Sequence, residues 1–289
     1  MTGRLVSRRD WLRFGVALAG STLASGCASL RNNRAALPNK HSLRADQLLI
    51  VSDFKIDSHH PLIEDLLRLR KQVSQTLSMP LGTKTVMVYL FSTEQQYKQY
   101  WDVTYPGFPS RRAYFVQTPN KELAVYTAWS ERVQEDLRHE FTHGLLHASL
   151  EAVPLWLDEG LAEYFEVVAE GPSPVNPDYA HLLMTAVQNG WRPDLERLET
   201  LEAVKEMQRA DYRESWAWTH WMLHGSDEGR EVLLGYLREL RTNPNPGKLS
   251  DRLFTEVPAA DERLLAYVTT LPSTALLQTG GVNQRANLP

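Results

Sequence analysis

The segment His139-Glu140-Phe141-Thr142-His143 constrains the fold of this chain more than any other stretch. A helix advances about 100° per residue, so residues four apart lie one turn apart on the same face. If the segment is helical, His139 and His143 can reach a single ion, and Glu140 lies beside them. Zinc takes neutral imidazole ligands, and a nearby carboxylate can accept a proton from the water that zinc activates. The segment therefore predicts a metal-binding helix that also carries a base.

The surrounding residues predict the helix that this motif needs. Over residues 131–150 the apolar positions recur at close to helical spacing, and neither Gly nor Pro occurs before Gly144. These apolar positions are Val133, Leu137, Phe141, Leu145 and Ala148. One side of the helix would be buried by them, which favours an interior metal site over two unrelated surface histidines.

A second helix follows after a short turn at about residues 150–153. Pro154 suits a first turn, residues 155–168 are good helix formers apart from Gly160, and a Gly-Pro pair at 171–172 ends the stretch. Because the turn is short, the two helices must lie back to back.

This packing brings a carboxylate toward the histidines as a third ligand. Asp158, Glu159 and Glu163 all lie on the second helix. Helix geometry alone does not choose among these three residues.

The two segments, H-E-F-T-H and P-L-W-L-D-E-G-L-A-E-Y, resemble those of the gluzincin metallopeptidases, the group of thermolysin and the membrane-alanyl aminopeptidases. They are most similar to small bacterial proteins described as peptidase-MA-like. The resemblance implies that His139, His143 and Glu159 bind one Zn²⁺ ion and that Glu140 is the general base. Glu163 matches a carboxylate that orients the first histidine. The 15-residue gap between His143 and Glu159 is shorter than in the best-known members.

Periodicity elsewhere predicts an α+β fold. Strands are expected at 47–56, 84–91, 113–117 and 122–128, and helices at 61–79 and 93–100, with Thr93 as a cap. Further helices are expected at 177–190 with Asn176 as the cap, and at 198–207, 212–224, 230–241 and 261–270. The resemblance implies a zincin-like arrangement: a small N-terminal mixed sheet with helices, a central helix pair and a C-terminal helical lobe.

This organisation predicts an α+β lobe at 47–171, a helical lobe at 172–272 and a loose tail at 273–289. In gluzincins the edge strand of the sheet pairs with the extended substrate backbone, a mode that needs no single substrate sequence. Residues 113–117 or 123–127 are the candidates for that edge. The alternative is an interior hairpin without substrate contact.

The N-terminus predicts export and lipid anchoring. Ser7-Arg8-Arg9-Asp10-Trp11-Leu12-Arg13 resembles a twin-arginine motif, and the apolar run 14–24 is too short to span a membrane. Ala24-Ser25-Gly26-Cys27 resembles a lipobox, which predicts a signal peptide at 1–27, a lipid on Cys27 and a flexible tether at 28–46. The alternative is an unlipidated signal with a fortuitous cysteine. The expected location is periplasmic or elsewhere in the cell envelope, with the outer membrane as one destination.

Composition and net charge limit the classes of partner that this chain is expected to bind. Cys27 is the only cysteine, so no disulfide can form within the chain and stability must come from the core. The net charge of −4 gives no support for nucleic acid as a partner. The expected partners are a peptide or protein substrate in the envelope, and the membrane through the lipid on Cys27.

Residues outside the main motif offer weaker candidates. By analogy with zincins, Tyr212 or Arg213 could stabilise a developing oxyanion, although the aromatic segment around them is also typical of core packing. His220 and His224 stand four apart, yet no Glu directly follows His220, which favours core or surface histidines. His147 would lie one turn beyond the metal pair.

Two functions follow from these observations. The first is a zinc metallopeptidase in which Glu140 activates water. An endopeptidase is favoured, because the G-x-M-E-N segment that binds a substrate amine in the aminopeptidases is absent. The second is a non-catalytic envelope lipoprotein that uses a zincin scaffold for binding or assembly.

Overall fold

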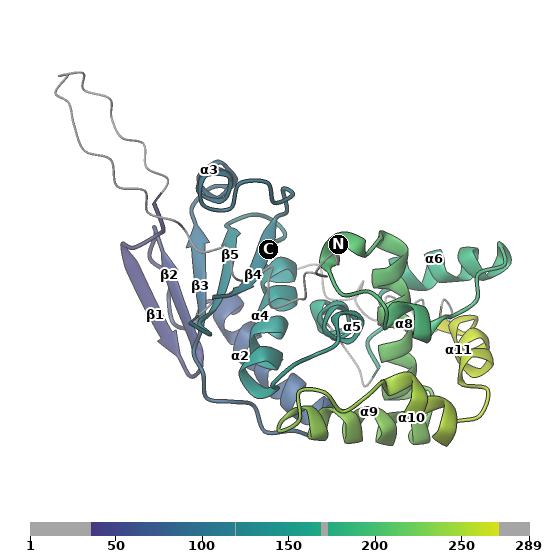
Figure 1. Cartoon of the computed structure of the whole chain (residues 1–289). Coiled ribbons are helices and arrows are strands. Elements are labelled where there is room, and N and C mark those ends of the chain that lie inside the picture. The colour runs from purple at the N-terminus through teal and green to yellow at the C-terminus, as the bar shows by residue number, and fades with distance from the viewer. Residues whose placement is uncertain (1–35, 119, 169–172, 272–289) are drawn as a thin grey trace, which may run out of the picture.

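The computed structural model describes residues 36–118, 120–168 and 173–271. Within these residues the chain is α+β, with a mixed five-stranded sheet followed by a largely helical half (Figure 1). The second helix ends at Glu166, with Val167 as its C-cap, before the Gly-Pro pair at 171–172 that was expected to end it. The signal peptide, Cys27 and the tail at 273–289 lie outside the described residues. These parts therefore stay predictions.

The sheet has the order β1-β2-β3-β5-β4. Its central strands β2, β3 and β5 are parallel, whereas β1 and β4 are antiparallel to their neighbours. The bounds are β1 His41–Ala45, β2 Leu48–Ser52, β3 Val86–Phe91, β4 Ala113–Gln117 and β5 Leu123–Ala128. The four strands expected from the sequence are confirmed, the last two form the expected hairpin, and β4 is an edge strand.

The tether expected at 28–46 is wrong in its last part, because His41–Ala45 forms β1. A two-residue turn at Asp46 and Gln47 joins β1 to β2, and Asp46 has the positive φ of 51° that tight hairpin turns use. Three of the five residues of β1 are exposed. An edge strand can be largely exposed and polar, so the sequence of β1 did not indicate a strand.

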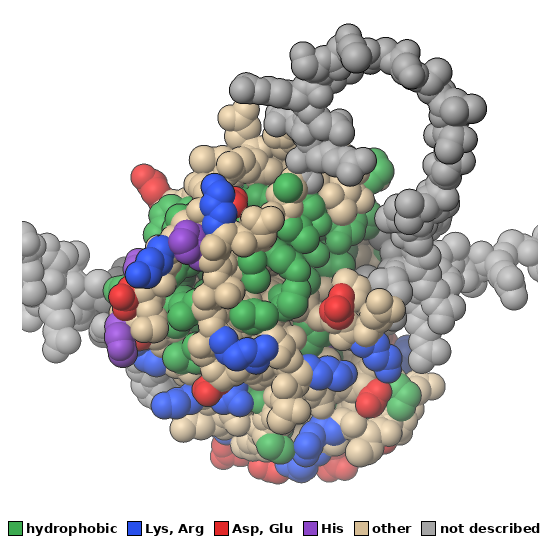
Figure 2. Space-filling view, turned by 90° about the vertical axis from the view of Figure 1, so that its left-hand side faces the viewer, with side chains coloured by type: hydrophobic (Ala, Val, Ile, Leu, Met, Phe, Trp, Pro, Cys, Tyr) green, Lys and Arg blue, Asp and Glu red, His purple; other side chains and the backbone are tan. Residues whose placement is uncertain are grey.

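Helices cover both faces of the sheet. On one face, α2 (Pro61–Thr76) and α4 (Val133–Ser149) pack against apolar residues that alternate along β2 and β3. On the other face, α3 (Glu94–Thr104) contributes to an aromatic cluster with Tyr126 of β5. Thr93 caps α3 as expected, accepting the Gln96 N–H at 3.2 Å. Figure 2 views the molecule from the side of β1, where hydrophobic side chains reach the surface among basic ones.

The second half of the chain packs around α8 (Arg209–His224), which lies against α5 (Leu155–Glu166) (Figure 1). The longer helices around it are α6 Pro177–Gln188, α9 Asp227–Leu240, α10 Leu249–Glu256 and α11 Ala260–Val268. Asn176 caps α6, as expected. One continuous hydrophobic core runs from the strands through α5 and α8 to α11. The two expected lobes therefore share their packing.

The helix expected at 198–207 is wrong. A short helix α7 (Leu195–Leu198) and a 3-10 turn η1 (Val204–Glu206) occur there instead. The Glu206 carboxylate accepts the backbone N–H groups of Glu202 and Ala203, at 3.0 and 3.2 Å. Such local bonds from side chain to backbone compete with a continuous helix.

Helix α10 was not expected from the sequence. Its first N–H groups, on Leu249 and Ser250, are accepted by the carboxylate of Glu199 at 2.8 and 3.1 Å. An acceptor for the free N–H groups of a helix start stabilises that start. Because this acceptor lies about fifty positions away in the chain, no local pattern indicates it.

Gly160 allows α5 to approach α8 closely. A Cβ atom at this position would lie 2.6 Å from both the Ser215 carbonyl oxygen and Thr219 Oγ1. We expect Gly160→Ala to lower the free energy of unfolding by about 1 to 3 kcal/mol through overpacking, although alanine is the better helix former. Urea unfolding of both proteins measures the difference.

Gly235→Ala in α9 is the matched control for this substitution. There, the nearest atom to the added Cβ is the end of the flexible Arg238 side chain at 3.6 Å. The control should unfold at the same urea concentration as wild type or a higher one. Equal stability of the Gly160→Ala protein and wild type would contradict the close approach of α5 and α8.

Candidate metal centre

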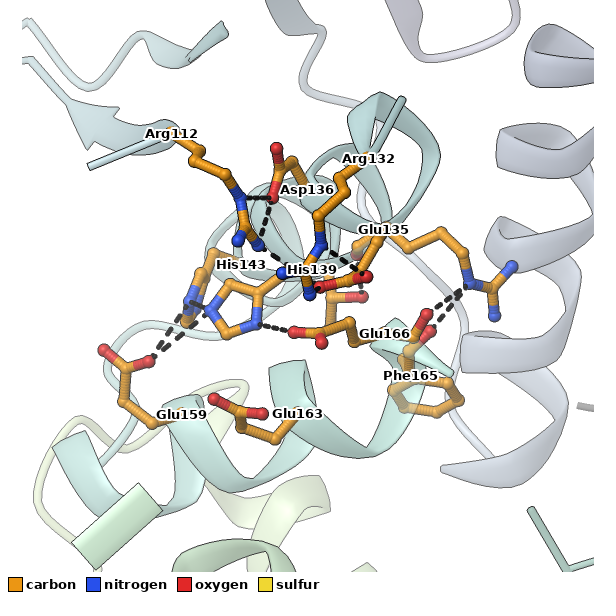
Figure 3. Close-up of polar contacts among 12 residues, drawn as sticks. Arg112, Arg132, Glu135, Asp136, His139, His143, Glu159, Glu163, Phe165 and Glu166 are labelled. Atoms are coloured by element: carbon orange, nitrogen blue, oxygen red, sulfur yellow. Dashed lines mark hydrogen bonds and ion pairs between the residues drawn. The ribbon is translucent and has the colours of Figure 1, made fainter. Parts of the chain in front are cut away.

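Helix α4 carries both histidines of the motif on one face, as the sequence predicts. The Nε2 atoms of His139 and His143 lie 3.3 Å apart. Glu159 of α5 points toward the same place, with its Oε2 3.6 Å from His139 Nε2 and 3.7 Å from His143 Nε2 (Figure 3). Of the three carboxylates that helix geometry left open, Glu159 is thus the one that contacts both Nε2 atoms.

These three separations match the face of a coordination tetrahedron. A tetrahedral ion with bonds of 2.0 to 2.2 Å, as zinc makes to nitrogen and oxygen, requires ligand atoms about 3.3 to 3.6 Å apart. The observed values of 3.3, 3.6 and 3.7 Å are close to this range. The buried group of His139, His143 and Glu159 can therefore hold a metal ion.

The electrostatics of these residues favour a bound cation. Burial lowers the pKa of His139, but hydrogen bonds to Glu159 and Glu166 raise it by more, so its pKa lies well above the ordinary value. Burial raises the pKa of Glu159, and the two histidines lower it by more. The carboxylates thus hold positive charge on the imidazoles, and a metal ion can replace the protons that carry it.

Asp158 supports the second histidine rather than contributing to the triad. Its Oδ1 lies 3.1 Å from His143 Nδ1 and its Oδ2 lies 2.9 Å from His147 Nε2. A carboxylate on the far nitrogen of a histidine orients the ring and raises its basicity as a ligand. Asp158 therefore holds His143 with Nε2 directed toward Glu159, and His147 completes this support from outside the triad.

We expect Asp158→Asn to lower the affinity for zinc by about 10- to 100-fold, because the amide cannot supply the negative charge beside His143. Competition with a chromophoric chelator measures the dissociation constant. Asp178→Asn, on the exposed start of α6, is the control and should leave the affinity unchanged. Equal affinities for wild type and the Asp158 variant would show that this carboxylate does not act on the ligand.

Glu163 does not make the contact expected of it. The carboxylate that bonds to the first histidine is Glu166, whose Oε2 lies 3.0 Å from His139 Nδ1 (Figure 3). Glu163 instead accepts the hydroxyl proton of Tyr179 at 2.8 Å, and burial raises its pKa to about 7. Nothing in the sequence near Glu166 marks this role, although it lies seven residues after Glu159 on the same side of α5.

Arg138 explains why the end of α5 lies beside His139. This buried arginine donates through Nε to the Phe165 carbonyl at 3.0 Å and through Nη1 to both carboxylate oxygens of Asp65 at 3.2 Å. It thereby joins α4, α2 and the last turn of α5. Buried charges of this kind are retained where both partners and their hydrogen bonds are present.

Glu140 is half-buried and faces the edge strand. Its carboxylate accepts a hydrogen bond from the Phe115 backbone of β4. Burial raises the pKa of Glu140, and the charges of His139 and His143 offset only part of that rise. The Phe115 ring lies along His143, with 5.9 Å between centroids. The predicted base, a histidine and the edge strand therefore meet in one place.

Comparison with known proteins adds no family. No protein-family model matches this chain, and no curated protein sequence is significantly similar to it. The metal centre must therefore be interpreted from its own geometry and from the motif. Within the described residues, no helix combines the length and the apolar character needed to cross a bilayer.

Tyr212, at the start of α8, lies close to this centre. Its hydroxyl accepts a hydrogen bond from Arg111 Nη2 at 3.3 Å, and burial together with the charge of Glu159 raises its pKa. Arg111, in the segment before β4, was not expected from the sequence. Only the approach of the segment before β4 to the start of α8 brings it here. Within the part of the chain that the structure describes, Arg213, the other sequence candidate, makes no hydrogen bond or ion pair with the triad.

The second histidine pair has no metal ligand set in the described residues. His220 is fully buried and bonds to the Pro174 carbonyl at 3.0 Å and the Tyr267 hydroxyl at 2.9 Å. His224 bonds to the Tyr164 hydroxyl at 2.8 Å. Burial lowers the pKa of His220 to about 3, so this ring is neutral at physiological pH. His220 is thus a buried core histidine, whereas His224 is half-buried, in line with the expectation of core or surface histidines.

Proposed function

We propose that this protein is a zinc-dependent peptidase of the gluzincin kind, with a zincin-like fold. The observation that carries the proposal is the triangle of His139, His143 and Glu159 at tetrahedral spacing, with Glu140 directly beside the first histidine. A purely structural zinc site is closed by four protein ligands, whereas three leave a position for the reaction. The resemblance of the two helix segments to gluzincins supports the same conclusion.

Two imidazoles and one carboxylate suit zinc, which accepts nitrogen and oxygen donors in tetrahedral geometry. When bound, zinc supplies a Lewis acid that polarises the scissile carbonyl and lowers the pKa of water in the site.

The chain's own residues move the protons. Glu140 takes a proton from the attacking water and passes it to the nitrogen of the leaving amine. Its raised pKa suits this exchange, because a base works best when its pKa is near the working pH. Tyr212, whose hydroxyl keeps its proton, donates it as a hydrogen bond to the developing oxyanion.

Strand β4 is the proposed support for the substrate backbone. It is an edge strand and its Phe115 lies beside both Glu140 and His143. An extended peptide added to this edge would gain main-chain hydrogen bonds without a demand for one sequence. Internal bonds of envelope peptides or proteins are the proposed substrates, reached through export by the twin-arginine signal and anchoring at Cys27.

Metal removal tests the proposal. We expect one zinc ion per purified chain by elemental analysis, and cleavage of peptides from a mixed library detected by mass spectrometry. Dialysis against a chelator should abolish cleavage, and stoichiometric zinc should restore it, because the proposed reaction depends on the Lewis acid that zinc supplies. Zinc binding without any cleavage would favour the alternative function, a non-catalytic scaffold. Absence of zinc after reconstitution would contradict the proposed metal site of His139, His143 and Glu159.

A further inference from the structure

Arg111 differs from the other arginines near the metal centre in its partners. Arg112 pairs with Asp136, Arg132 pairs with Glu135, and Arg138 pairs with Asp65. Within the described residues, no carboxylate lies within ion-pair distance of Arg111. A guanidinium has five N–H donors, and within the described residues Arg111 makes one hydrogen bond, to Tyr212. Most of its binding capacity is therefore unused.

The position of Arg111 places its unused N–H donors beside the proposed site of peptide cleavage. The residue lies two positions before β4, and its contact with Tyr212 reaches across to α8. Arg111 also lies four positions before Phe115, whose ring stacks on His143 with 5.9 Å between centroids, so the segment before β4 runs beside the metal triad. The guanidinium also lies 5.7 Å from the ring centroid of Tyr114, a contact that helps to hold it in place. Arg111 is exposed, so a substrate can reach it.

The negative charge around the metal centre makes Arg111 a selective place for a negative group of the substrate. Glu140, Asp158, Glu159, Glu163 and Glu166 all gather near the histidines. A negative group on a bound peptide would meet repulsion from these residues unless a fixed cation accepts it. The planar fork of an arginine matches a carboxylate with two parallel hydrogen bonds.

We infer that Arg111 binds a carboxylate of the peptide substrate close to the cleaved bond. The carboxylate can come from an acidic side chain or from the end of the peptide chain. This inference rests on the proposed function and adds a substrate class to it, namely peptides with a negative group at a defined distance from the cleavage position. Tyr212 remains the donor to the oxyanion, and Arg111 is a specificity residue beside it.

The test measures binding without turnover. Zinc-loaded protein carrying Glu140→Gln is titrated into three peptide pools labelled with an uncharged fluorophore, and fluorescence anisotropy gives the affinity. One pool has neutral side chains and an amidated end, the second has neutral side chains and a free carboxyl end, and the third is amidated with one Glu per peptide. At least one acidic pool should bind about 10- to 100-fold tighter than the neutral pool. The pool that does so identifies the source of the carboxylate.

Variants of Arg111 distinguish binding of a substrate carboxylate from a role in holding Tyr212 in place. Arg111→Ala should remove the advantage of the acidic pool and leave binding of the neutral pool and of zinc unchanged. Arg111→Lys keeps the charge without the fork and should retain part of the advantage. Arg209→Ala, an exposed arginine at the start of α8, is the control and should change nothing.

Two results would overturn the inference alone. One is equal affinity of the Glu140→Gln protein for all three pools. The other is an equal loss for all pools in Arg111→Ala, which would make the residue only a support for Tyr212. Cleavage of the neutral pool by zinc-loaded wild type would then keep the peptidase function. If no pool binds and none is cleaved, the proposed function fails and the inference falls with it.

Discussion

Glu140→Gln is expected to lower kcat for peptide cleavage by about 10²- to 10⁴-fold, the range that a positioned general base contributes. Glutamine has nearly the same shape but cannot accept the proton of the attacking water. Its side-chain oxygen can still accept the hydrogen bond from the Phe115 backbone, so the local structure should persist. Zinc should remain at one ion per chain, because Glu140 is not one of the three residues of the triad.

Initial rates on a cleaved library peptide and zinc analysis of the same sample measure the two effects together. Glu131→Gln is the control, since this exposed glutamate lies just before α4 and away from the triad. It should leave both quantities unchanged. Retained peptidase activity in a clean, zinc-loaded Glu140→Gln protein would refute the role of Glu140 as the base.

Glu159→Ala is expected to abolish stoichiometric zinc binding, and with it all peptide cleavage. The substitution removes one of three donors and leaves the two histidines as an incomplete set. Loss of a supporting carboxylate costs 10- to 100-fold in affinity, and loss of a direct ligand should cost more than about 100-fold. Alanine is a good helix former, so α5 should remain folded. Elemental analysis after gel filtration measures the bound zinc, and circular dichroism on the same sample measures the helix content.

Glu163→Ala is the matched control for this experiment, because it removes a second carboxylate from the same face of α5. Glu163 bonds to Tyr179 rather than to either Nε2 atom. Its variant should keep close to one zinc ion per chain. Equal zinc in the Glu159 variant and wild type, or loss in the Glu163 variant alone, would move the third ligand to another carboxylate.

Elements with strong local signals were predictable from the sequence. Helices α4 and α5 have periodic apolar positions, α3 and α6 begin with side-chain caps at Thr93 and Asn176, and β4 and β5 form the expected hairpin. Strand β1 and helix α10 were not predictable from the sequence, because each is stabilised by residues of another segment. Strand β1 is stabilised by pairing with β2, and α10 by the distant carboxylate of Glu199.

The sequence by itself determined the part of the site that one helix contains. Residues four apart on a helix must share a face, so His139, His143 and the adjacent Glu140 needed no tertiary information. The choice among carboxylates, the support of His143 by Asp158 and the bond from Glu166 to His139 were decided only by the packing of α5 against α4. The same holds for Arg111, which meets Tyr212 from about a hundred residues away. Helix geometry is local, whereas a distance between two helices is set by the side chains packed between them.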